Sequence, residues 1–303
     1  MAILLADVGG TNARLALARD GVLDPASIAR FRGEDHPDFD RVLRLYLDAR
    51  GRPGIEAACV AVAGPVRAGS ARLTNRDWSF SEPRLAALTG AGRALLINDM
   101  IALGHAAAAL PEADAGFLRP PPPGAAGNGQ RLVVNAGTGF NVCPVRLMPG
   151  GAAICLEAED GHTRLPLPLA ALLGEIAAGF DSVEELFAGR GLARLHALRS
   201  GQAPGDARVV TEAAARGDAS AEASCTLQAR LLGLYCRELA LRFMPLAGIF
   251  LAGSVARACA GRFAAFEAGL LQDPLMAGIV HAVPVAVIGD DLAALHGCLA
   301  ALA

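Results

Sequence analysis

The stretch ILLADVGGTNARLALA, residues 3–18, decides how the chain is expected to fold. An apolar run over residues 3–8 stops at Gly9 and Gly10, and an alternating apolar pattern resumes over residues 13–18. Two such runs around a pair of glycines predict a β-hairpin. Because glycine has no Cβ, the backbone of this turn can approach a phosphate and point successive N–H groups at it. An ordinary hairpin turn with an incidental acid is the alternative.

The same pattern returns after residues 111–130, a proline- and glycine-rich segment that we interpret as a linker. LVVNAGTGFNVCPV, residues 132–145, predicts strand, glycine turn and strand again. Two such loops, one in each half of the chain, favour a nucleotide-binding protein in which both halves contact the phosphate tail of the nucleotide. A third glycine turn, Gly253-Ser254, lies between an apolar run and a helical pattern, where α/β proteins often bind nucleotides. Close packing of that strand and helix is the alternative.

The rest of the chain reads as an α/β protein. Continuous apolar runs predict buried strands at residues 55–64, 94–99, 247–253 and 281–289. Helical patterns cover residues 38–50, 100–110, 220–243, 254–271 and the C-terminal end.

Composition excludes several classes of enzyme. All 27 basic residues are arginine, so the lysine of a Walker A loop, of a protein kinase or of a Schiff base is absent. The net charge of −3 argues against a nucleic-acid partner. Seven cysteines without a C-x-x-C pair indicate free thiols in a reducing cytoplasm. The longest uncharged run, residues 274–289, is shorter than a membrane span, and the N-terminus does not read as a signal peptide. We therefore expect a cytoplasmic protein without membrane contact.

Acids and amides follow the predicted strands. Asn98 and Asp99 end an apolar strand, and Asp99 could accept a proton from a hydroxyl that attacks phosphorus. An N-cap of the following helix is the other interpretation of Asp99. Asp7, beside the first glycine loop, could hold Mg²⁺ through water. The segment Glu157 to His162 offers acceptors and an imidazole suited to a polyhydroxylated ligand, while a metal site there is disfavoured because no second histidine lies nearby.

In this order the motifs closely resemble the bacterial ATP-dependent glucokinases of the hexokinase superfamily. The resemblance covers essentially the whole chain and is carried by LLADVGGTNARLAL (4–17), AVAGPV (61–66), LTNRDW (73–78), LLINDM (95–100), NAGTG (135–139), EDGH (159–162), VEELFAGRGL (183–192) and GIFLAGSVAR (248–257).

The resemblance implies a two-lobed α/β fold of the actin-like ATPase (ribonuclease H-like) type, with a sugar and ATP cleft between the lobes. It places residues 1–109 and 290–303 in a small domain and residues 110–289 in a large one. The implied reaction is ATP-dependent phosphorylation of glucose to glucose 6-phosphate with Mg²⁺, and enzymes of this type are usually homodimers.

The resemblance also implies roles for individual residues. The nucleotide would contact the two loops and the third glycine turn: Ala6, Asp7, Val8, Gly9, Gly10, Thr11, Asn12, Gly137, Thr138, Gly139, Gly253 and Ser254. The sugar hydroxyls would be bound by Asn98, Asp99, Glu159, His162 and Glu184, with Asp99 as general base on the 6-hydroxyl.

Three positions depart from the family's pattern. Asn141 stands where glycine is more frequent, Ser254 replaces the second glycine of its turn, and Asp160 replaces a glycine between Glu159 and His162. We expect Asn141 to narrow the nucleotide site and Asp160 to add negative charge beside the sugar. A kinase for another hexose or an amino sugar, and a non-catalytic sugar sensor, remain alternatives. A nicotinamide oxidoreductase is disfavoured because the glycine loops join strand to strand.

Overall fold

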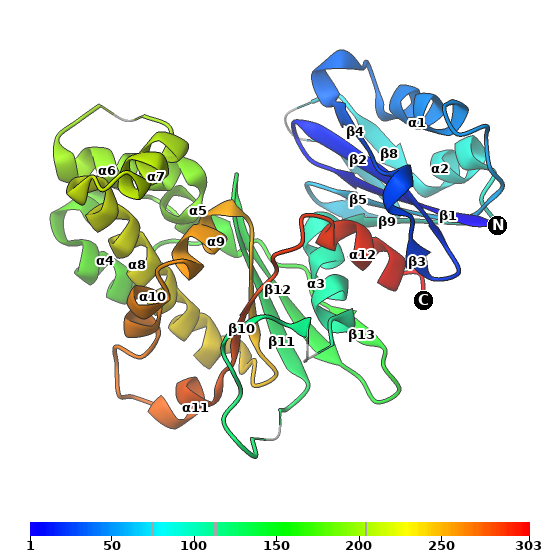
Figure 1. Ribbon diagram of the computed structural model, residues 1–303. Coiled ribbons are helices and arrows are strands. Elements are labelled where there is room, and N and C mark those ends of the chain that lie inside the picture. The colour runs from blue at the N-terminus through cyan, green and yellow to red at the C-terminus, as the bar shows by residue number, and fades with distance from the viewer. Residues whose placement is uncertain (74–75, 112–113, 126, 204) are drawn as a thin grey trace. The chain divides into compact units, whose positions relative to one another are not determined.

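The computed structural model describes residues 1–73, 76–111, 114–125, 127–203 and 205–303. The chain divides into two compact units (Figure 1). Residues 1–109 and 290–303 form the first unit, and residues 110–289 form the second.

The first unit is built on a sheet whose strands run in the order β3 (Val22–Leu23), β2 (Asn12–Arg19), β1 (Ala2–Val8), β5 (Ile55–Val62) and β9 (Arg93–Asn98), with β4 (Ala29–Arg32) also paired to β2. β1 and β2 form the antiparallel hairpin predicted around Gly9 and Gly10, so that prediction is confirmed. β1, β5 and β9 are parallel. A separate small sheet contains β6 (Val66–Arg67), β7 (Ser70–Arg72) and β8 (Ser79–Ser81).

Helices cover both faces of the larger sheet of this unit. Leu4 of β1 belongs to a core shared with α1 (Phe39–Asp48) and α2 (Glu82–Thr89). Its neighbour Leu5 points to the opposite face, into a core shared with α3 (Asp99–Ala109) and α12 (Ala293–Ala300). This alternation follows from the period of two along a strand, and it explains why β1 is apolar at nearly every position.

The second unit repeats the arrangement of the first. Its strands run in the order β10 (Phe117–Arg119), β15 (Val285–Val287), β14 (Ile249–Ala252), β11 (Gln130–Ala136), β12 (Phe140–Leu147) and β13 (Ala153–Cys155). β11 and β12 form the second predicted hairpin, around Gly137 to Gly139, and β11, β14 and β15 are parallel. Each unit therefore pairs one antiparallel hairpin with two further parallel strands.

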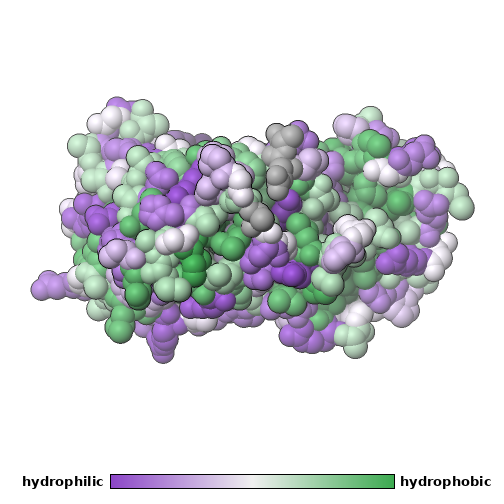
Figure 2. All heavy atoms as spheres, turned by 90° about the horizontal axis from the view of Figure 1, so that it is seen from below, coloured by the Kyte–Doolittle hydropathy of each residue, from purple (hydrophilic) through white to green (hydrophobic). Residues whose placement is uncertain are grey.

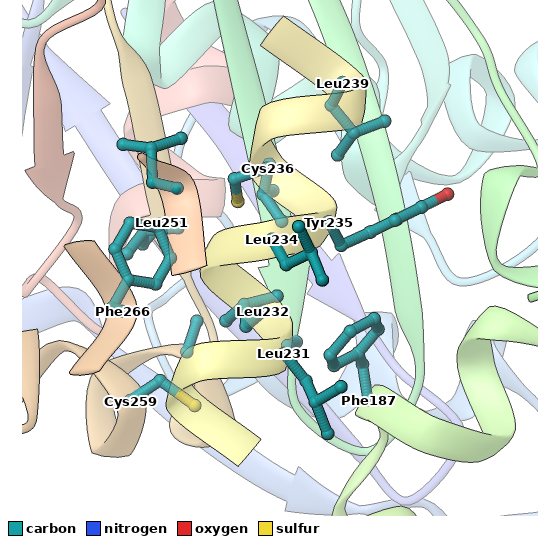
Figure 3. Close-up of a cluster of buried hydrophobic side chains, with 14 of the residues drawn as sticks. Phe187, Leu231, Leu232, Leu234, Tyr235, Cys236, Leu239, Leu251, Cys259 and Phe266 are labelled. Atoms are coloured by element: carbon teal, nitrogen blue, oxygen red, sulfur yellow. The ribbon is translucent and has the colours of Figure 1, made fainter. Parts of the chain in front are cut away.

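The helices of the second unit are α4 (Leu167–Leu173), α5 (Val183–Phe187), α6 (Gly189–Ser200), α7 (Ala207–Ala215), α8 (Ala219–Phe243), α9 (Ser254–Ala260), α10 (Phe263–Leu270) and α11 (Ala277–Ala282). Short 3₁₀ turns occur at Pro25–Ser27, Gly33–Asp35, Asp160–His162 and Gly174–Gly179. The long α8 supplies much of the core, including Leu232, Tyr235 and Leu239 (Figure 3).

The structure corrects three expectations about the second unit. The segment interpreted as a linker contains β10, which pairs antiparallel with β15. The helix expected over residues 254–271 is two helices, because the chain leaves helical geometry at Arg262. His281 belongs to α11, so β15 is shorter than the strand expected over residues 281–289.

Polar and apolar side chains are interspersed over the face of the molecule seen in Figure 2. Among the helices of the described residues, none combines the length and the apolar character that crossing a bilayer requires.

Candidate active site

The first glycine loop and Asp99 follow strands that end at the same edge of one sheet. Val8 of β1 is in register with Val62 of β5, which is in register with Asn98 of β9. Because β5 separates the other two strands, the ends of β1 and β9 lie about 10 Å apart. The sheet therefore brings the loop after Val8 and the carboxylate of Asp99 to one edge of the first unit.

The first loop is held by backbone hydrogen bonds. The Gly9 N–H donates to the Asn12 carbonyl at 2.9 Å, and the Gly33 N–H donates to the Thr11 carbonyl at 2.8 Å. The guanidinium of Arg76 donates to the Gly10 carbonyl at 3.3 Å. Arg76 belongs to the LTNRDW motif, of which residues 74 and 75 lie outside the described residues. The loop thus has one fixed path, with Thr11 and Asn12 exposed.

Ala6 and Val8, which we expected among the nucleotide contacts, have fully buried side chains in the core of the first unit. A ligand at the loop would meet the backbone after these residues, not their side chains. Because Ala6 and Val8 are packed in the core, they fix the position at which the loop begins.

Asp7 lines a pocket of about 150 Å³ together with Asn12, Ala13, Arg14 and Arg30. Its Oδ2 lies 3.9 Å from Nη1 of Arg14. Burial raises the pKa of Asp7, and the charge of Arg14 only partly opposes that effect. A carboxylate deprived of water is stabilised by a nearby cation, so the chemistry of Asp7 fits a Mg²⁺ ion held through water.

Asn98 and Asp99 share the start of α3. Oδ1 of Asn98 accepts a hydrogen bond from the Met100 N–H at 2.8 Å, and its Nδ2 donates to the Gly64 carbonyl at 2.9 Å. Oδ1 of Asp99 accepts from the same Met100 N–H at 2.9 Å. The interpretation of Asp99 as the N-cap is therefore corrected: Asp99 is the first residue of α3, and the residue before it provides the capping oxygen. The helix N-terminus favours a negative charge there.

In the second unit, the second glycine loop and the third glycine turn lie side by side. A Cβ added at Gly137 would lie 3.7 Å from Cα of Gly253 and 3.7 Å from the Ser254 nitrogen. Gly253 has φ +88°, and a Cβ there would lie 2.3 Å from the Ala136 carbonyl oxygen. The approach of these two turns therefore requires glycine at position 253.

Glu184 of α5 lies against the second loop. Its Oε2 accepts a hydrogen bond from the Phe140 N–H at 3.1 Å, and its Oε1 accepts one from Arg190 at 2.6 Å. Arg190 also contacts the Thr138 carbonyl at 3.5 Å. Burial raises the pKa of Glu184, but the hydrogen bonds from Arg190 and Phe140 and the charge of Arg190 outweigh it, so the pKa is lowered. Arg190 lies within the motif over residues 183–192, but we did not assign it a role from the sequence.

Glu159 precedes the 3₁₀ turn Asp160–His162, and His162 is its last residue; both are exposed, with 3.9 Å between Oε2 of Glu159 and Nε2 of His162. A Cβ added at Gly161 would lie 2.2 Å from the Phe140 carbonyl oxygen and 3.3 Å from Cβ of Glu184. The turn therefore packs directly on β12 and α5. The structure thus brings Glu159 and His162 close to Glu184, which lies more than twenty residues further along the chain.

Asp160 does not extend beside Glu159 and His162 as we expected. Its side chain is buried, with Oδ2 accepting a hydrogen bond from the Tyr235 hydroxyl and Oδ1 paired with Arg242 at 3.0 Å. Because the exposed Arg242 pairs with this buried carboxylate and balances its charge, Asp160 adds little negative potential at the surface of the turn.

The side chain of Asn141 is likewise hydrogen-bonded to the turn. Its Nδ2 donates to the Ala158 carbonyl at 2.7 Å, and its Oδ1 accepts from the Asp160 N–H at 3.1 Å. The side chain that we expected to narrow the nucleotide site instead holds the segment that carries Glu159.

The chain is similar to known proteins over its whole length. A family model described as Glucokinase matches residues 4–303. A glucokinase of Cupriavidus pinatubonensis is 32% identical over 318 residues, covering 99% of this chain and 92% of the relative. The crystal structure of glucokinase from an Antarctic psychrotroph has a TM-score of 0.82 and 28% identity, covering 99% of this chain and 98% of that chain.

A ROK family glucokinase from Streptomyces griseus, solved in complex with glucose and AMPPNP, has a TM-score of 0.69 at 20% identity, and the match covers 100% of this chain and 99% of that chain. At this identity the likeness concerns the fold. The fold of this chain is thus α/β and of the actin-like ATPase type, as the sequence motifs implied.

Proposed function

The chain belongs to the glucokinase family, and from this premise we propose that Asp99 is the general base that activates the 6-hydroxyl of glucose for attack on ATP. The reaction is the ATP-dependent phosphorylation of glucose. The observation that carries the proposal is the position of Asp99 at the carboxyl end of β9, on the same sheet edge as the first glycine loop.

The proposed step needs a carboxylate that is ionised, fixed and able to accept a proton. Asp99 begins α3, where the helix N-terminus stabilises a negative charge. The Met100 N–H binds one of its carboxylate oxygens, and Asn98, itself held by Gly64, sets the path of the backbone before it. The proton of the sugar hydroxyl would pass to the carboxylate of Asp99 as the hydroxyl oxygen attacks the γ-phosphorus.

We propose that the two glycine loops and the turn at Gly253-Ser254 bind the nucleotide. Their backbone N–H groups would hold the polyphosphate, and Asp7 would bind Mg²⁺ through water. Magnesium supplies charge neutralisation of the phosphates when it is bound. Because phosphoryl transfer depends mainly on positioning and on charge neutralisation, a chain without lysine can carry it out.

We propose that the sugar is bound by the residues that the resemblance implies: Asn98, Asp99, Glu159, His162 and Glu184. Carboxylates accept hydrogen bonds from sugar hydroxyls, and the lowered pKa of Glu184 keeps that group in the accepting form. This set of ligands suits a hexose with several free hydroxyls. The homodimer implied by the resemblance and the cytoplasmic location expected from the composition both remain predictions.

The test replaces Asp99 by asparagine, which keeps the size of the side chain and removes the base. We expect Asp99→Asn to lower kcat by a factor of about 10² or more while the glucose dissociation constant changes much less. ADP release gives the rate, and calorimetry gives the binding. Asp48→Asn, which removes a surface partner of Arg52 in the same unit, is the matched control and should leave both values unchanged. Turnover close to wild type in Asp99→Asn would remove Asp99 from the mechanism.

The same ADP-release assay separates glucose from other substrates. Glucose, mannose, fructose, galactose and N-acetylglucosamine are compared at equal concentration, and we expect the largest kcat/KM for glucose. A larger value for N-acetylglucosamine would support the amino-sugar alternative. The sugar-sensor alternative rested in part on Asp160 as a departure from the family's pattern near the sugar. That support is removed, because Asp160 lies buried against Arg242 and Tyr235.

A further inference from the structure

The turn that carries Glu159 and His162 is held from two sides by side chains that the proposed chemistry does not use. On one side, Asn141 of β12 makes four hydrogen bonds. Its Nδ2 donates to the Ala158 carbonyl at 2.7 Å and to Oε2 of Glu159 at 3.3 Å. Its Oδ1 accepts from the N–H groups of Val142 at 2.8 Å and Asp160 at 3.1 Å. One amide thus ties a strand to the backbone and the side chain of the turn.

On the other side, Asp160 ties the turn to α8. It is 7% exposed, and both of its oxygens are bound by residues of that helix, Tyr235 and Arg242. Tyr235 is itself fully buried, and its ring lies 5.5 Å from that of Phe187 and 5.7 Å from that of Phe140. In Figure 3 the Tyr235 hydroxyl points away from the apolar cluster around Cys236 and Phe266. Asp160 is therefore bound to a helix that packs in the core of the second unit.

The two restraints meet at one residue, because the Asp160 N–H donates to Asn141 while the Asp160 carboxylate binds α8. We propose that Asn141 and Asp160 are positioning residues that fix the carboxylate of Glu159 and the imidazole of His162 before the sugar binds. This inference rests on the proposed function of Glu159 and His162 as sugar ligands.

The exposure of Glu159 explains why it needs such support. Its side chain is 61% exposed, and its contact with His162 spans 3.9 Å. Even an ion pair between exposed groups stabilises a structure little, so this long contact alone would leave the carboxylate free to sample several rotamers. The Nδ2 of Asn141 restricts it. A ligand that meets a fixed side chain loses less entropy on binding than one that must order it.

The test measures the KM for glucose and for ATP in Asn141→Ala and Asp160→Gly. We expect the glucose KM to rise about tenfold, a free energy of about 1.4 kcal/mol, while the ATP KM stays unchanged and kcat changes less than the glucose KM. Asp160→Asn keeps the shape and the acceptor for Tyr235, so it should recover part of the glucose affinity that Asp160→Gly loses. An unchanged glucose KM in both Asn141→Ala and Asp160→Gly would overturn the inference.

A second ion pair on α8 provides the matched control for a loss of stability alone. Glu222 pairs with Arg262 at 2.6 Å near the other end of this helix, twenty residues or about 30 Å from Arg242. Glu222→Gln should lower Tm without changing the glucose KM. If Glu222→Gln raised the glucose KM as much as Asp160→Gly does, the effect would be one of general stability and the positioning role would be wrong.

Amide hydrogen exchange without sugar separates this inference from the proposed function. The N–H groups of Asp160 and Thr163 are hydrogen-bonded within the turn and to Asn141, so they should exchange faster in Asp160→Gly and in Asn141→Ala. Unchanged exchange would refute the fixing of the turn. Faster exchange with an unaltered glucose KM would show that the restraint on the turn does not serve glucose binding. If the wild-type protein neither bound nor phosphorylated any hexose, the proposed function would fail, and with it the positioning of a sugar, whereas faster exchange would still establish the restraint on the turn.

Discussion

At the scale of single residues, the ion pair between Glu184 and Arg190 links a proposed sugar ligand to the second glycine loop. Arg190 binds Oε1 of Glu184 at 2.6 Å and contacts the Thr138 carbonyl at 3.5 Å. It also opposes the effect of burial on Glu184, whose pKa is lowered as a result. A carboxyl with a depressed pKa stays ionised to lower pH. The stability that the pair adds is present above the unfolded pKa and is lost as the pH falls through the folded one.

Arg190→Met should therefore raise the pKa of Glu184. If ionised Glu184 binds the sugar, the acidic limb of the pH dependence of glucose affinity should move to higher pH, because the carboxyl would be protonated earlier as the solution is acidified. Calorimetric titration with glucose across the acidic range measures this shift.

Arg194→Met is the matched control, because Arg194 lies one helical turn further along α6 and pairs with Glu185 at 3.7 Å. It should leave the pH dependence unaltered. An identical shift in both variants would mean that general charge, and not the specific pair, sets the pKa of Glu184.

Motifs in the sequence were sufficient to select candidate residues but not to show what those residues contact. Asp99 could be selected because it ends a predicted strand, and Glu159 because it belongs to the short motif EDGH. The contacts of Asp160 with Tyr235 and Arg242 join positions more than seventy residues apart. No local pattern reports such an approach, so an acid that the motif placed beside the sugar is in fact buried.

At the scale of elements, α8 and α10 pack backbone against backbone. A Cβ added at Gly233 of α8 would lie 1.8 Å from the Phe266 carbonyl oxygen, and one added at Gly269 of α10 would lie 2.0 Å from the Arg230 carbonyl oxygen. Reciprocal glycines thus let two core helices approach more closely than any side chain would allow. The helix axes would have to separate to accommodate even a methyl group.

Gly233→Ala should therefore destabilise the protein by about 1–3 kcal/mol or more, despite the higher helix propensity of alanine, because overpacking forces backbone shifts. Chemical denaturation measures the change. Gly278→Ala in α11 is the control, since a Cβ there would meet no heavy atom of the described residues within 4 Å. That substitution should be neutral or slightly stabilising. Equal destabilisation by the two substitutions would contradict the close packing.

Most elements could be located from periodicity, and the exceptions have physical reasons. Both hairpins and the long α8 follow from strong local patterns. β10 is three residues within a proline-rich segment, and its hydrogen bonds come from β15, more than 160 residues away. The break between α9 and α10 follows a glycine in an otherwise continuous helical pattern. Short strands and helix breaks depend on tertiary partners that periodicity does not report.

At the scale of the whole molecule, α12 is separated from the other elements of its unit by the entire second unit in the chain. Leu295 and Cys298 of α12 are fully buried against the sheet face that contains Leu5 and Cys59. A Cβ added at Gly297 would lie 1.7 Å from the Ala102 carbonyl oxygen, so α12 also packs closely on α3. The last helix is thus an integral part of the core of the first unit.

Leu295→Ala should weaken the first unit selectively. A buried leucine replaced by alanine costs about 2–5 kcal/mol, and we expect amide exchange to accelerate in β1 and β5 while β11 and β14 keep their protection. Leu239→Ala, which truncates an equally buried leucine of α8, is the reciprocal control and should accelerate exchange in β11 and β14. Uniform acceleration across both units in either variant would mean that the units do not unfold separately.

The position of α12 in the chain also determines when the first unit can be completed during translation. A ribosome delivers residues 1–109 first, yet α12, one of the two helices that cover one face of their sheet, is translated only after residues 110–289. The second unit thus has all its parts while the first still exposes Leu5 and Cys59. The unit whose first residues are made earliest is therefore the unit that is completed last, and until α12 is made its sheet offers nascent-chain chaperones an apolar surface.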